Sequence, residues 1–361
     1  MCQARLIGAP EPAARPAVRG ARPVPSKVIA MVRTTPPRPV DISALFPELG
    51  PLAREAVRLH PRPGAPTAQD SSVGGPLLWP ADEPWPSCEE HAGPWHLGFA
   101  PEDVRLRRHI LHLAWGRPRQ PGEPLLTAEE QATIDRIGVS GTRIEQDGPV
   151  PLLPVAQLYA RDLPELSRPE GTDLLQVLWC PFEHGMDCLP GIRLRWRDST
   201  AVGTPLAAAP QPSVIDSTDY LPAPCVLHPE PVTEYPAPLQ LPDELADRIT
   251  DWVEQGNPDY QTDLSVAPGW KLGGWGHWSF SDPWPIHCTE CGGETTTLLT
   301  VDSGEWGDDT WRPLEDADPA DGHPYPLPHE PTQVTIGRGY TMQTYLCAAE
   351  PFSHPPVQTM Q

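Results

Sequence analysis

The chain has 361 residues and a net charge of −22, and it contains 52 prolines and 13 tryptophans. Because proline interrupts helices and central strands, this composition disfavours a helical bundle and favours short strands joined by long loops around an apolar core. The negative charge disfavours a nucleic-acid partner, since it repels phosphates, and no apolar run is long enough to span a membrane.

The first 40 residues differ from the rest of the chain in charge. They carry seven basic groups and one acid, Glu11, which leaves a net charge of −28 for the remainder. They lack the continuous apolar core of a signal peptide, so we expect a disordered leader on a soluble, cytoplasmic protein. A transit peptide and translation that starts at Met31 are the alternatives.

Local patterns predict helices in three places. Leucines at near-helical spacing predict two short helices in residues 41–60, and TAEEQATIDRIG, residues 127–138, has the Thr cap and early acids of a helix. The clearest helix is expected in LPDELADRITDWVEQGN, residues 241–257, where Leu245 and Ile249 lie on one apolar face.

Strands are expected from short apolar runs and from alternating patterns. The segment RLRRHILHLAWG could also form a strand, although its pattern is harder to interpret. The expected strands cover residues 105–116, 150–160, 173–180, 191–198, 295–303, 332–339 and 341–347.

Two stretches in different halves of the chain repeat each other. VGGPLLWPADEPWPSCEEH, residues 73–91, aligns with LGGWGHWSFSDPWPIHCTEC, residues 272–291. LLQVLWCPFEH, residues 174–184, aligns with TMQTYLCAAEPFSH, residues 341–354. The repetition indicates an internal duplication. The paired glycines predict tight turns, and the tryptophans beside them predict two small apolar cores, with an exposed groove for an extended peptide as the alternative.

We therefore predict an α+β, β-rich fold with two duplicated lobes of antiparallel sheet, a few short helices and long Pro-rich loops. The predicted segments are a leader (1–40), short helices with a linker (41–70), a first lobe (71–230) that contains an insertion (93–149), a bridging helix segment (231–269) and a second lobe (270–361).

Cysteine and histidine spacing predicts one metal site in each lobe. A two-residue spacer can aim two side chains at one ion, and zinc prefers four Cys or His ligands in a tetrahedron. The stronger site combines Cys288, Cys291, Cys347 and His354, and the weaker one combines Cys88, His91, Cys180 and His184. Four protein ligands leave no place for water, so we expect structural zinc.

Other arrangements of the same ligands remain open. Cys188 could replace His184, or Cys88 and His91 could join Cys288 and Cys291 across the lobes. Reduced cysteine pairs without metal have the same spacing.

The VGG…W…DPWP opening, the strands followed by Cys and His, and the final FSHPPVQTMQ resemble the bacterial YwqG-like family of uncharacterised domains, in particular its actinobacterial branch. The resemblance covers residues 70–361 and is most specific at 222–302 and 333–361. That family is similar to eukaryotic programmed cell death protein 2 and its ribosome-assembly relatives, which also duplicate a Gly-Gly/Trp-Pro, C-x2-C unit and act as chaperones for a ribosomal protein. The resemblance implies a protein-binding module, although His91 departs from the doubled C-x2-C pattern.

We expect a non-catalytic protein that binds another protein, either a basic or a newly synthesised one. The chain has no G-x-S-x-G, H-E-x-x-H, P-loop or G-x-G-x-x-G motif. For the acid-rich residues 302–322 we expect a mobile, solvated loop, with a cradle for a basic partner as the alternative. One alternative is a zinc-dependent hydrolase with an open metal position, for which Glu183, Asp187 or Glu290 could serve as the base. The other is an immunity protein, because some YwqG-like genes are suspected to lie in toxin neighbourhoods.

Overall fold

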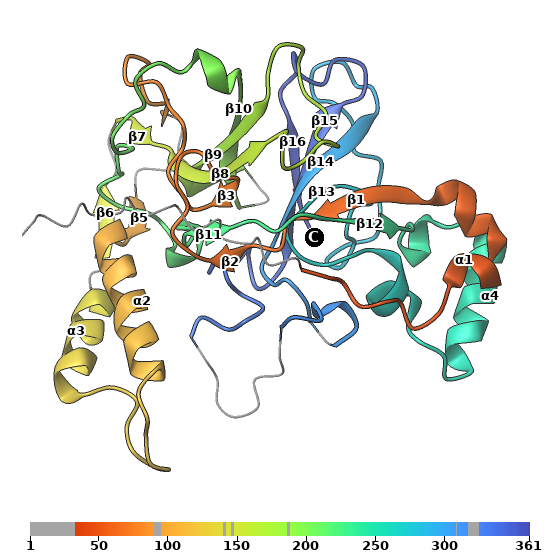
Figure 1. Cartoon of the computed structure of the whole chain (residues 1–361), viewed down its shortest axis with the longest axis horizontal. Coiled ribbons are helices and arrows are strands. Elements are labelled where there is room, and N and C mark those ends of the chain that lie inside the picture. Colours follow the sequence, from red (N-terminus) through yellow and green to blue (C-terminus); the bar gives the residue numbers. More distant parts are fainter. Residues whose placement is uncertain are drawn as a thin grey trace, which may run out of the picture. The chain divides into compact units, whose positions relative to one another are not determined.

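Two antiparallel sheets of six strands each dominate the structure, a computed structural model that describes residues 33–89, 95–139, 142–145, 148–185, 188–307, 309–316 and 325–361. The β15 sheet contains, in spatial order, β12 (Glu230–Glu234), β1 (Arg54–Arg58), β13 (Lys271–Gly273), β14 (Thr295–Asp302), β15 (Thr341–Cys347) and β16 (Val357–Met360) (Figure 1). The β9 sheet contains, in order, β10 (Leu189–Arg197), β9 (Leu174–His184), β8 (Leu153–Tyr159), β3 (Ser72–Val73), β11 (Cys225–Val226) and β2 (Arg62–Pro63).

Two short ribbons accompany these sheets. One pairs β4 (Ser87–Cys88) with β7 (Val150–Pro151), and the other pairs β5 (Trp95–Gly98) with β6 (Thr142–Glu145). The described residues therefore have the predicted α+β, β-rich fold, and the main core contains buried residues from both six-stranded sheets.

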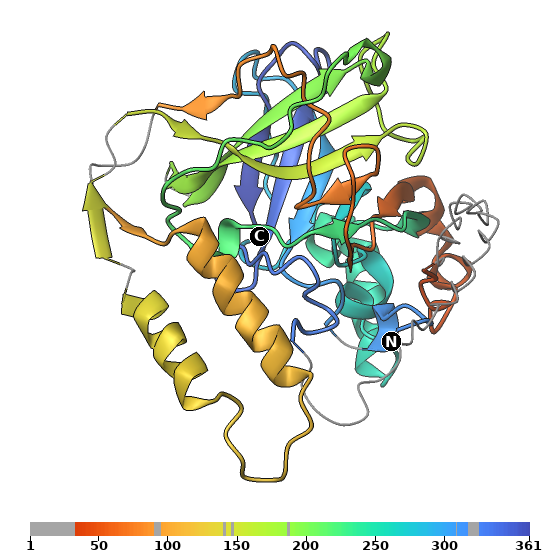
Figure 2. The same cartoon turned by 60° about the vertical axis from the view of Figure 1, so that its left-hand side comes forward.

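The longer helices form two groups beside the sheets, and Val104 of one of them belongs to the main core. Helices α2 (Pro101–Trp115) and α3 (Ala128–Val139) lie side by side (Figure 2). Helices α1 (Ile42–Leu45) and α4 (Asp243–Glu254) share a second apolar cluster that includes Leu245 and Ile249, as the sequence predicts. The shorter helical turns are η1 (Pro47–Leu52), η2 (Ser199–Ala201), η3 (Thr218–Tyr220), η4 (Pro238–Gln240), the π-helix η5 (Tyr260–Ser265) and η6 (Asp309–Trp311).

The strand predicted for residues 105–116 is wrong, because these residues belong to helix α2. Pro101 begins the helix, and the buried Val104 and Ala114 lie on the side that faces the protein. Arg108 fixes this helix to the protein by donating hydrogen bonds to the carbonyl oxygens of Thr218, Leu221 and Gln333. The residues that contact the protein, Val104, Arg108 and Ala114, are spaced as in a helix and not at alternate positions as in a strand. The many charged residues of the segment hide this spacing in the sequence.

Two further predictions of local structure need correction. After η1 the chain forms β1 instead of a second regular helix, because Ala56 and Val57 pair with strands on both sides. Residues 332–339 form no strand, since Gly337 and Gly339 adopt positive φ and close a turn in which Ile336 pairs only with Tyr340. Glycine permits this turn without the steric cost that a Cβ would bring.

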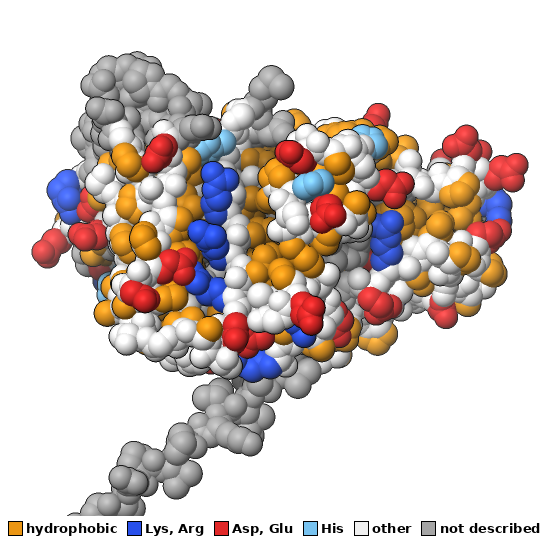
Figure 3. Space-filling model, turned by 90° about the horizontal axis from the view of Figure 1, so that it is seen from above, with side chains coloured by type: hydrophobic (Ala, Val, Ile, Leu, Met, Phe, Trp, Pro, Cys, Tyr) orange, Lys and Arg blue, Asp and Glu red, His pale blue; other side chains and the backbone are white. Residues whose placement is uncertain are grey.

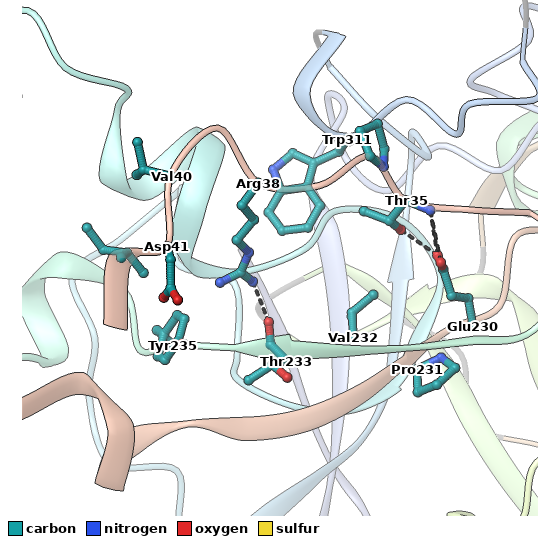
Figure 4. Close-up of a pocket in the computed structure, with 12 residues that line it drawn as sticks. Thr35, Arg38, Val40, Asp41, Glu230, Pro231, Val232, Thr233, Tyr235 and Trp311 are labelled. Atoms are coloured by element: carbon teal, nitrogen blue, oxygen red, sulfur yellow. Dashed lines mark hydrogen bonds between the residues drawn. The ribbon is translucent and has the colours of Figure 1, made fainter. Parts of the chain in front are cut away.

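The chain that leads into α1 lies against the edge strand β12 (Figure 4). Thr35 donates hydrogen bonds from its N and Oγ1 to the Glu230 carboxylate. Arg38 donates to the Thr233 carbonyl oxygen and lies 5.3 Å from the ring centroid of Trp311. These residues border a cavity of about 420 Å³, which this segment closes on one side.

The chain is therefore packed against the sheet before residue 40, the boundary that the sequence analysis gave to a disordered leader. Residues 1–32 lie outside the described residues. Within the described ranges, no helix combines the length and apolarity that a membrane span requires.

A glycine pair stands at the end of a strand in each of the two six-stranded sheets. Gly74 after β3 and Gly273 at the end of β13 both have φ of +64°. A Cβ at Gly74 would lie 2.5 Å from the Ala223 carbonyl oxygen, so only glycine allows the two segments to approach this closely.

Replacing Gly74 by alanine is expected to lower the free energy of unfolding by about 3 kcal/mol or more, because a steric clash adds to the cost of the left-handed backbone. Gly171→Ala is the matched control, since Gly171 has φ of +78° but no atom within 4 Å of an added Cβ. It should lose only about 1 kcal/mol in urea denaturation. Equal losses in the two variants would contradict the steric explanation.

A buried polar network lies where β1 leaves the β15 sheet. Arg58 and His60 are fully buried, and Arg58 donates hydrogen bonds to the carbonyl oxygens of Glu305 and Trp311. His60 Nε2 lies 3.2 Å from Glu230 Oε2, and His60 Nδ1 lies 3.8 Å from Glu305 Oε2. Burial raises the pKa of Glu305 to about 7 and lowers the pKa of His60 to about 4.

The raised pKa of Glu305 predicts a loss of stability as the pH rises from about 4.5 through about 7, because the unfolded chain releases a proton that the folded chain keeps. The full effect is about 3 kcal/mol. In Glu305→Gln this loss should disappear. Urea denaturation from pH 5 to 8 should therefore show the unfolding free energy of the variant rising relative to that of the wild type. If the unfolding free energies of the variant and the wild type change in parallel with pH, Glu305 does not have the raised pKa.

Candidate metal centre

Four predicted ligands of the second half lie together. Their ligand atoms, three Cys Sγ atoms and one His nitrogen, all lie within 4.8 Å of one another. Cys288 Sγ is 3.4 Å from His354 Nδ1, and Cys291 Sγ is 3.6 Å from Cys347 Sγ. This cluster, Cys288, Cys291, Cys347 and His354, is called the Cys3His centre below.

Local backbone structure explains why the ligands converge. Cys288 N donates to the Gly293 carbonyl oxygen, and Gly292 N donates to the Cys288 carbonyl oxygen, so a tight turn presents both cysteines of the C-x2-C unit. The next strand, β14, pairs Thr295 with Cys347, which brings the end of β15 beside this turn. The chain then turns before β16 and returns His354 to the same place.

The spacing of the ligands fits a zinc ion. For tetrahedral zinc, standard bond lengths place two sulfurs about 3.8 Å apart and a sulfur and a nitrogen about 3.5 Å apart. The observed separations of 3.6 Å between Cys291 and Cys347 and 3.4 Å between Cys288 and His354 lie close to these values. Three thiols and one imidazole are also a usual ligand set of structural zinc.

Hydrogen bonds favour the thiolate form, which binds metals. The backbone N–H of Glu350 donates to Cys347 Sγ at 3.4 Å, and this contact lowers the pKa of Cys347 to about 6. A backbone hydrogen bond from Cys291 likewise lowers the pKa of Cys288. Two of the three thiols are thus shifted towards the thiolate form, whereas the contacts with Cys347 and Cys288 raise the pKa of Cys291.

The predicted ligands of the first half are brought together in part. Cys88, Cys180 and His184 have ligand atoms within 4.8 Å of one another, and Cys88 Sγ lies 3.7 Å from His184 Nε2. His91 lies outside the described residues. Cys188, the alternative to His184, is exposed and does not belong to this cluster of described residues. Burial raises the pKa of Cys180, which opposes a free thiolate there.

The arrangement that joins Cys88 to Cys288 and Cys291 across the halves is not adopted. Local pairing explains this. Cys88 on β4 pairs with Val150 of β7, just before β8 of the β9 sheet, and Cys180 lies within the buried run of β9, whereas Cys347 ends β15. Each half thus gathers a separate cluster of ligands that could hold a metal ion.

A cavity of about 480 Å³ borders the first cluster, and the two sheets meet beside it. Cys88, His184 and Arg193 line this cavity, together with Gln358. Gln358 also joins the edge strands β10 and β16, because it accepts a hydrogen bond from Ile192 N and donates one to the Pro190 carbonyl oxygen.

Equivalent tryptophan pairs support the loops that carry the ligands. The ring centroids of Trp79 and Trp85 are 4.9 Å apart, and those of Trp278 and Trp284 are 5.1 Å apart. These contacts are those of the small apolar cores that the sequence predicts. Trp284 nevertheless remains 46% exposed, so the core of the second half is partly open to solvent.

Sequence reasoning did not single out Phe352, which lies between Cys347 and His354. Phe352 is 37% exposed, and its ring centroid lies 5.4 Å from that of Trp196 on β10. An aromatic residue in the polar loop between two ligands was the signal that could have identified it. Exposed aromatic rings thus lie in both segments that carry the ligands of the Cys3His centre: Trp284 before Cys288 and Phe352 between Cys347 and His354.

The surface charge is not uniformly negative. On the face shown in Figure 3, a row of basic side chains runs between apolar and acidic ones. Strand β10 carries Arg193, Arg195 and Arg197 at alternate positions, and Arg197 forms an ion pair with Glu83. A basic partner would therefore have to dock away from β10.

A search against protein-family models found no match for this chain, and a search of curated proteins found no relative.

Proposed function

We propose that this protein is a non-catalytic, protein-binding module of the YwqG-like type, in which structural zinc holds the Cys3His centre. The convergence of Cys288, Cys291, Cys347 and His354 carries this proposal. Four protein ligands complete a tetrahedral coordination sphere, so the ion would fix the loop before β14 to the end of β15 and leave no position for an activated water.

Exposed aromatic side chains beside the Cys3His centre support the protein-binding part of the proposal. Trp284 precedes the C-x2-C turn and Phe352 precedes His354, and both remain substantially exposed. Exposed aromatic rings on a rigid support are typical anchors of protein interfaces. The net charge of −22 and the family resemblance favour a basic or newly synthesised protein as the partner.

Affinity capture tests this function. The immobilised protein is expected to retain a basic protein from an extract of its own cells at about 50 mM salt and to release it at about 500 mM, because salt screens the attraction. Trp284→Ala and Phe352→Ala should each weaken binding of that partner about tenfold or more in a calorimetric titration.

Leu239→Ala is the matched control, because Leu239 is 71% exposed and lies on η4, outside the Cys3His centre. It should change the affinity less than about twofold. The proposal fails if no protein is retained at low salt, or if the three variants bind equally well.

The first cluster supports a second candidate function, a zinc-dependent hydrolase. Cys88 and His184 border the cavity of about 480 Å³, so an ion held there would face a space that a substrate could enter. Hydrolysis of ester or phosphoester substrates that disappears in Cys88→Ser and persists in Cys188→Ser would favour this candidate. Purified, zinc-loaded protein without such activity would eliminate it.

A further inference from the structure

A cavity of about 380 Å³ lies between η5 and the end of β14, apart from both cysteine clusters. Its lining includes two tryptophans, Trp306 and Trp311, and two ionisable side chains, His277 and Asp302. Gln261 of the π-helix η5 contributes a polar amide to the same wall. Such irregular helical turns often occur at binding sites. The volume suits a small molecule or the end of a long side chain.

The Asp302 carboxyl group forms no ion pair with a cation of the described residues. Its carboxylate accepts hydrogen bonds from Gly269 N at 2.9 Å and Gly304 N at 3.2 Å. The nearby Lys271 ammonium is bonded to Glu234 instead, at 2.5 Å. Burial raises the pKa of Asp302, which reflects the cost of an ionised carboxylate without a partner cation.

His277 offers an unused hydrogen-bonding atom beside this carboxylate. Its Nδ1 atom is buried and has no hydrogen-bond partner among the described residues. Burial lowers the pKa of His277, which favours the neutral ring, and Nδ1 accepts a hydrogen bond in the tautomer that carries its proton on Nε2. A ligand with several N–H donors could therefore bond to Asp302 and His277 together.

The tryptophan walls are positioned to contact cations. Trp311 Nε1 donates to the Thr262 carbonyl oxygen at 2.6 Å, which fixes this ring against η5. The Arg58 guanidinium already lies 5.8 Å from the Trp311 centroid, and Arg62 lies 5.5 Å from that of Trp306. Both indoles thus stabilise guanidinium groups within the protein itself.

We propose that this cavity binds a guanidinium or ammonium group, whose N–H donors bond to Asp302 and His277 while Trp306 and Trp311 pack beside it. Within the described part of the chain, no third His, Cys, Asp or Glu completes a metal-binding group with these two residues, so the chemistry favours an organic cation over a metal ion. The group belongs either to a free small molecule or to an Arg or Lys side chain of a protein. Only the second source rests on the proposed protein-binding function.

Calorimetric titration of the zinc-loaded full chain with arginine amide tests this proposal. Binding is expected at ligand concentrations up to about 1 mM. Citrulline amide has nearly the same shape and the same α-amino group but lacks the guanidinium charge, so it should bind about tenfold more weakly or worse. Asp302→Asn should lose about tenfold or more in affinity for arginine amide. Asp251→Asn, which removes an exposed carboxylate from α4, should bind within about twofold of the wild type.

A second variant adds a bulky side chain to the cavity lining and keeps its charges. A Cβ at Gly307 would have no atom within 4 Å, so Gly307→Leu should fold normally, as circular dichroism can verify, and should exclude the ligand. Equal binding of arginine amide and citrulline amide, or unchanged affinity in both Asp302→Asn and Gly307→Leu, would overturn the proposal. Absence of arginine amide binding would also overturn it.

The source of the cation is settled by a blocked Gly-Arg-Gly peptide. Binding of this peptide supports an arginine side chain as the ligand, and binding of arginine amide alone supports a free small cation. Retention of a protein partner without binding of either probe would leave the proposed function intact and refute this inference. Binding of arginine amide without retention of any protein partner would support this inference and refute the proposed protein-binding function.

Discussion

A Cys288→Ser variant is expected to lose bound zinc and to unfold about 10 °C or more below the wild type. Structural zinc contributes about 10 kcal/mol or more of apparent binding energy in small zinc domains, and a three-ligand remnant holds the ion far less tightly. The loops that this centre would hold together lie partly at the surface, since Cys291 is exposed and Trp284, which packs on Trp278, is 46% exposed. Elemental analysis and thermal unfolding measure both effects.

Cys225→Ser is the control for this experiment. Cys225 is also buried, but it lies in β11 of the β9 sheet and belongs to neither cluster. The variant should keep its zinc and lose only the small contribution of one buried thiol, which donates to the Pro331 carbonyl oxygen. An unchanged zinc content in Cys288→Ser would rule out a metal at the Cys3His centre.

Breaking the buried ion pair between Lys271 and Glu234 is expected to cost about 3 to 5 kcal/mol of unfolding free energy. Both side chains are fully buried, and Lys271 Nζ lies 2.5 Å from Glu234 Oε1. Lys271→Met would leave a carboxylate that also accepts hydrogen bonds from Ala267 N and Trp275 N in a site without water. Urea denaturation should show the loss, and adding Glu234→Gln should restore part of it.

An exposed pair provides the comparison. Arg248 Nη1 lies 2.6 Å from Glu48 Oε1, but the two side chains are 52% and 51% exposed. Arg248→Met should therefore cost less than about 1 kcal/mol. Similar losses for Lys271→Met and Arg248→Met would show that burial adds nothing to the strength of the Lys271 contact.

Periodicity and spacing predicted much of this structure, because short-range rules govern the features concerned. The α4 helix follows from its apolar face and its flanking Pro242 and Gly256, and the long strands β9 and β15 follow from their apolar runs. The ligands of the Cys3His centre could be chosen because the aligned segments place Cys347 at the end of β15 and Cys180 at the corresponding position of β9. The duplication itself stays a prediction.

The remaining features depend on contacts that no local pattern encodes. Helix α2 looks irregular in sequence because charged residues, including Arg108, make part of its contact face. The pocket beside Asp302 and His277 unites residues on either side of the C-x2-C turn with a π-helix, so no motif announces it. The rarity of lysine was a signal that could have identified the buried ion pair. Lys27 and Lys271 are the only two lysines in the chain, and Lys271 is fully buried.

The position of β1 governs the order in which the β15 sheet can assemble on the ribosome. This strand is made early, yet its neighbours are β12 and β13, which follow it by more than 170 residues. Its edges must remain without their partners until most of the chain has been synthesised, and pairing over such separations is slow. The β15 sheet can therefore close around β1 only after β12 and β13 have been synthesised.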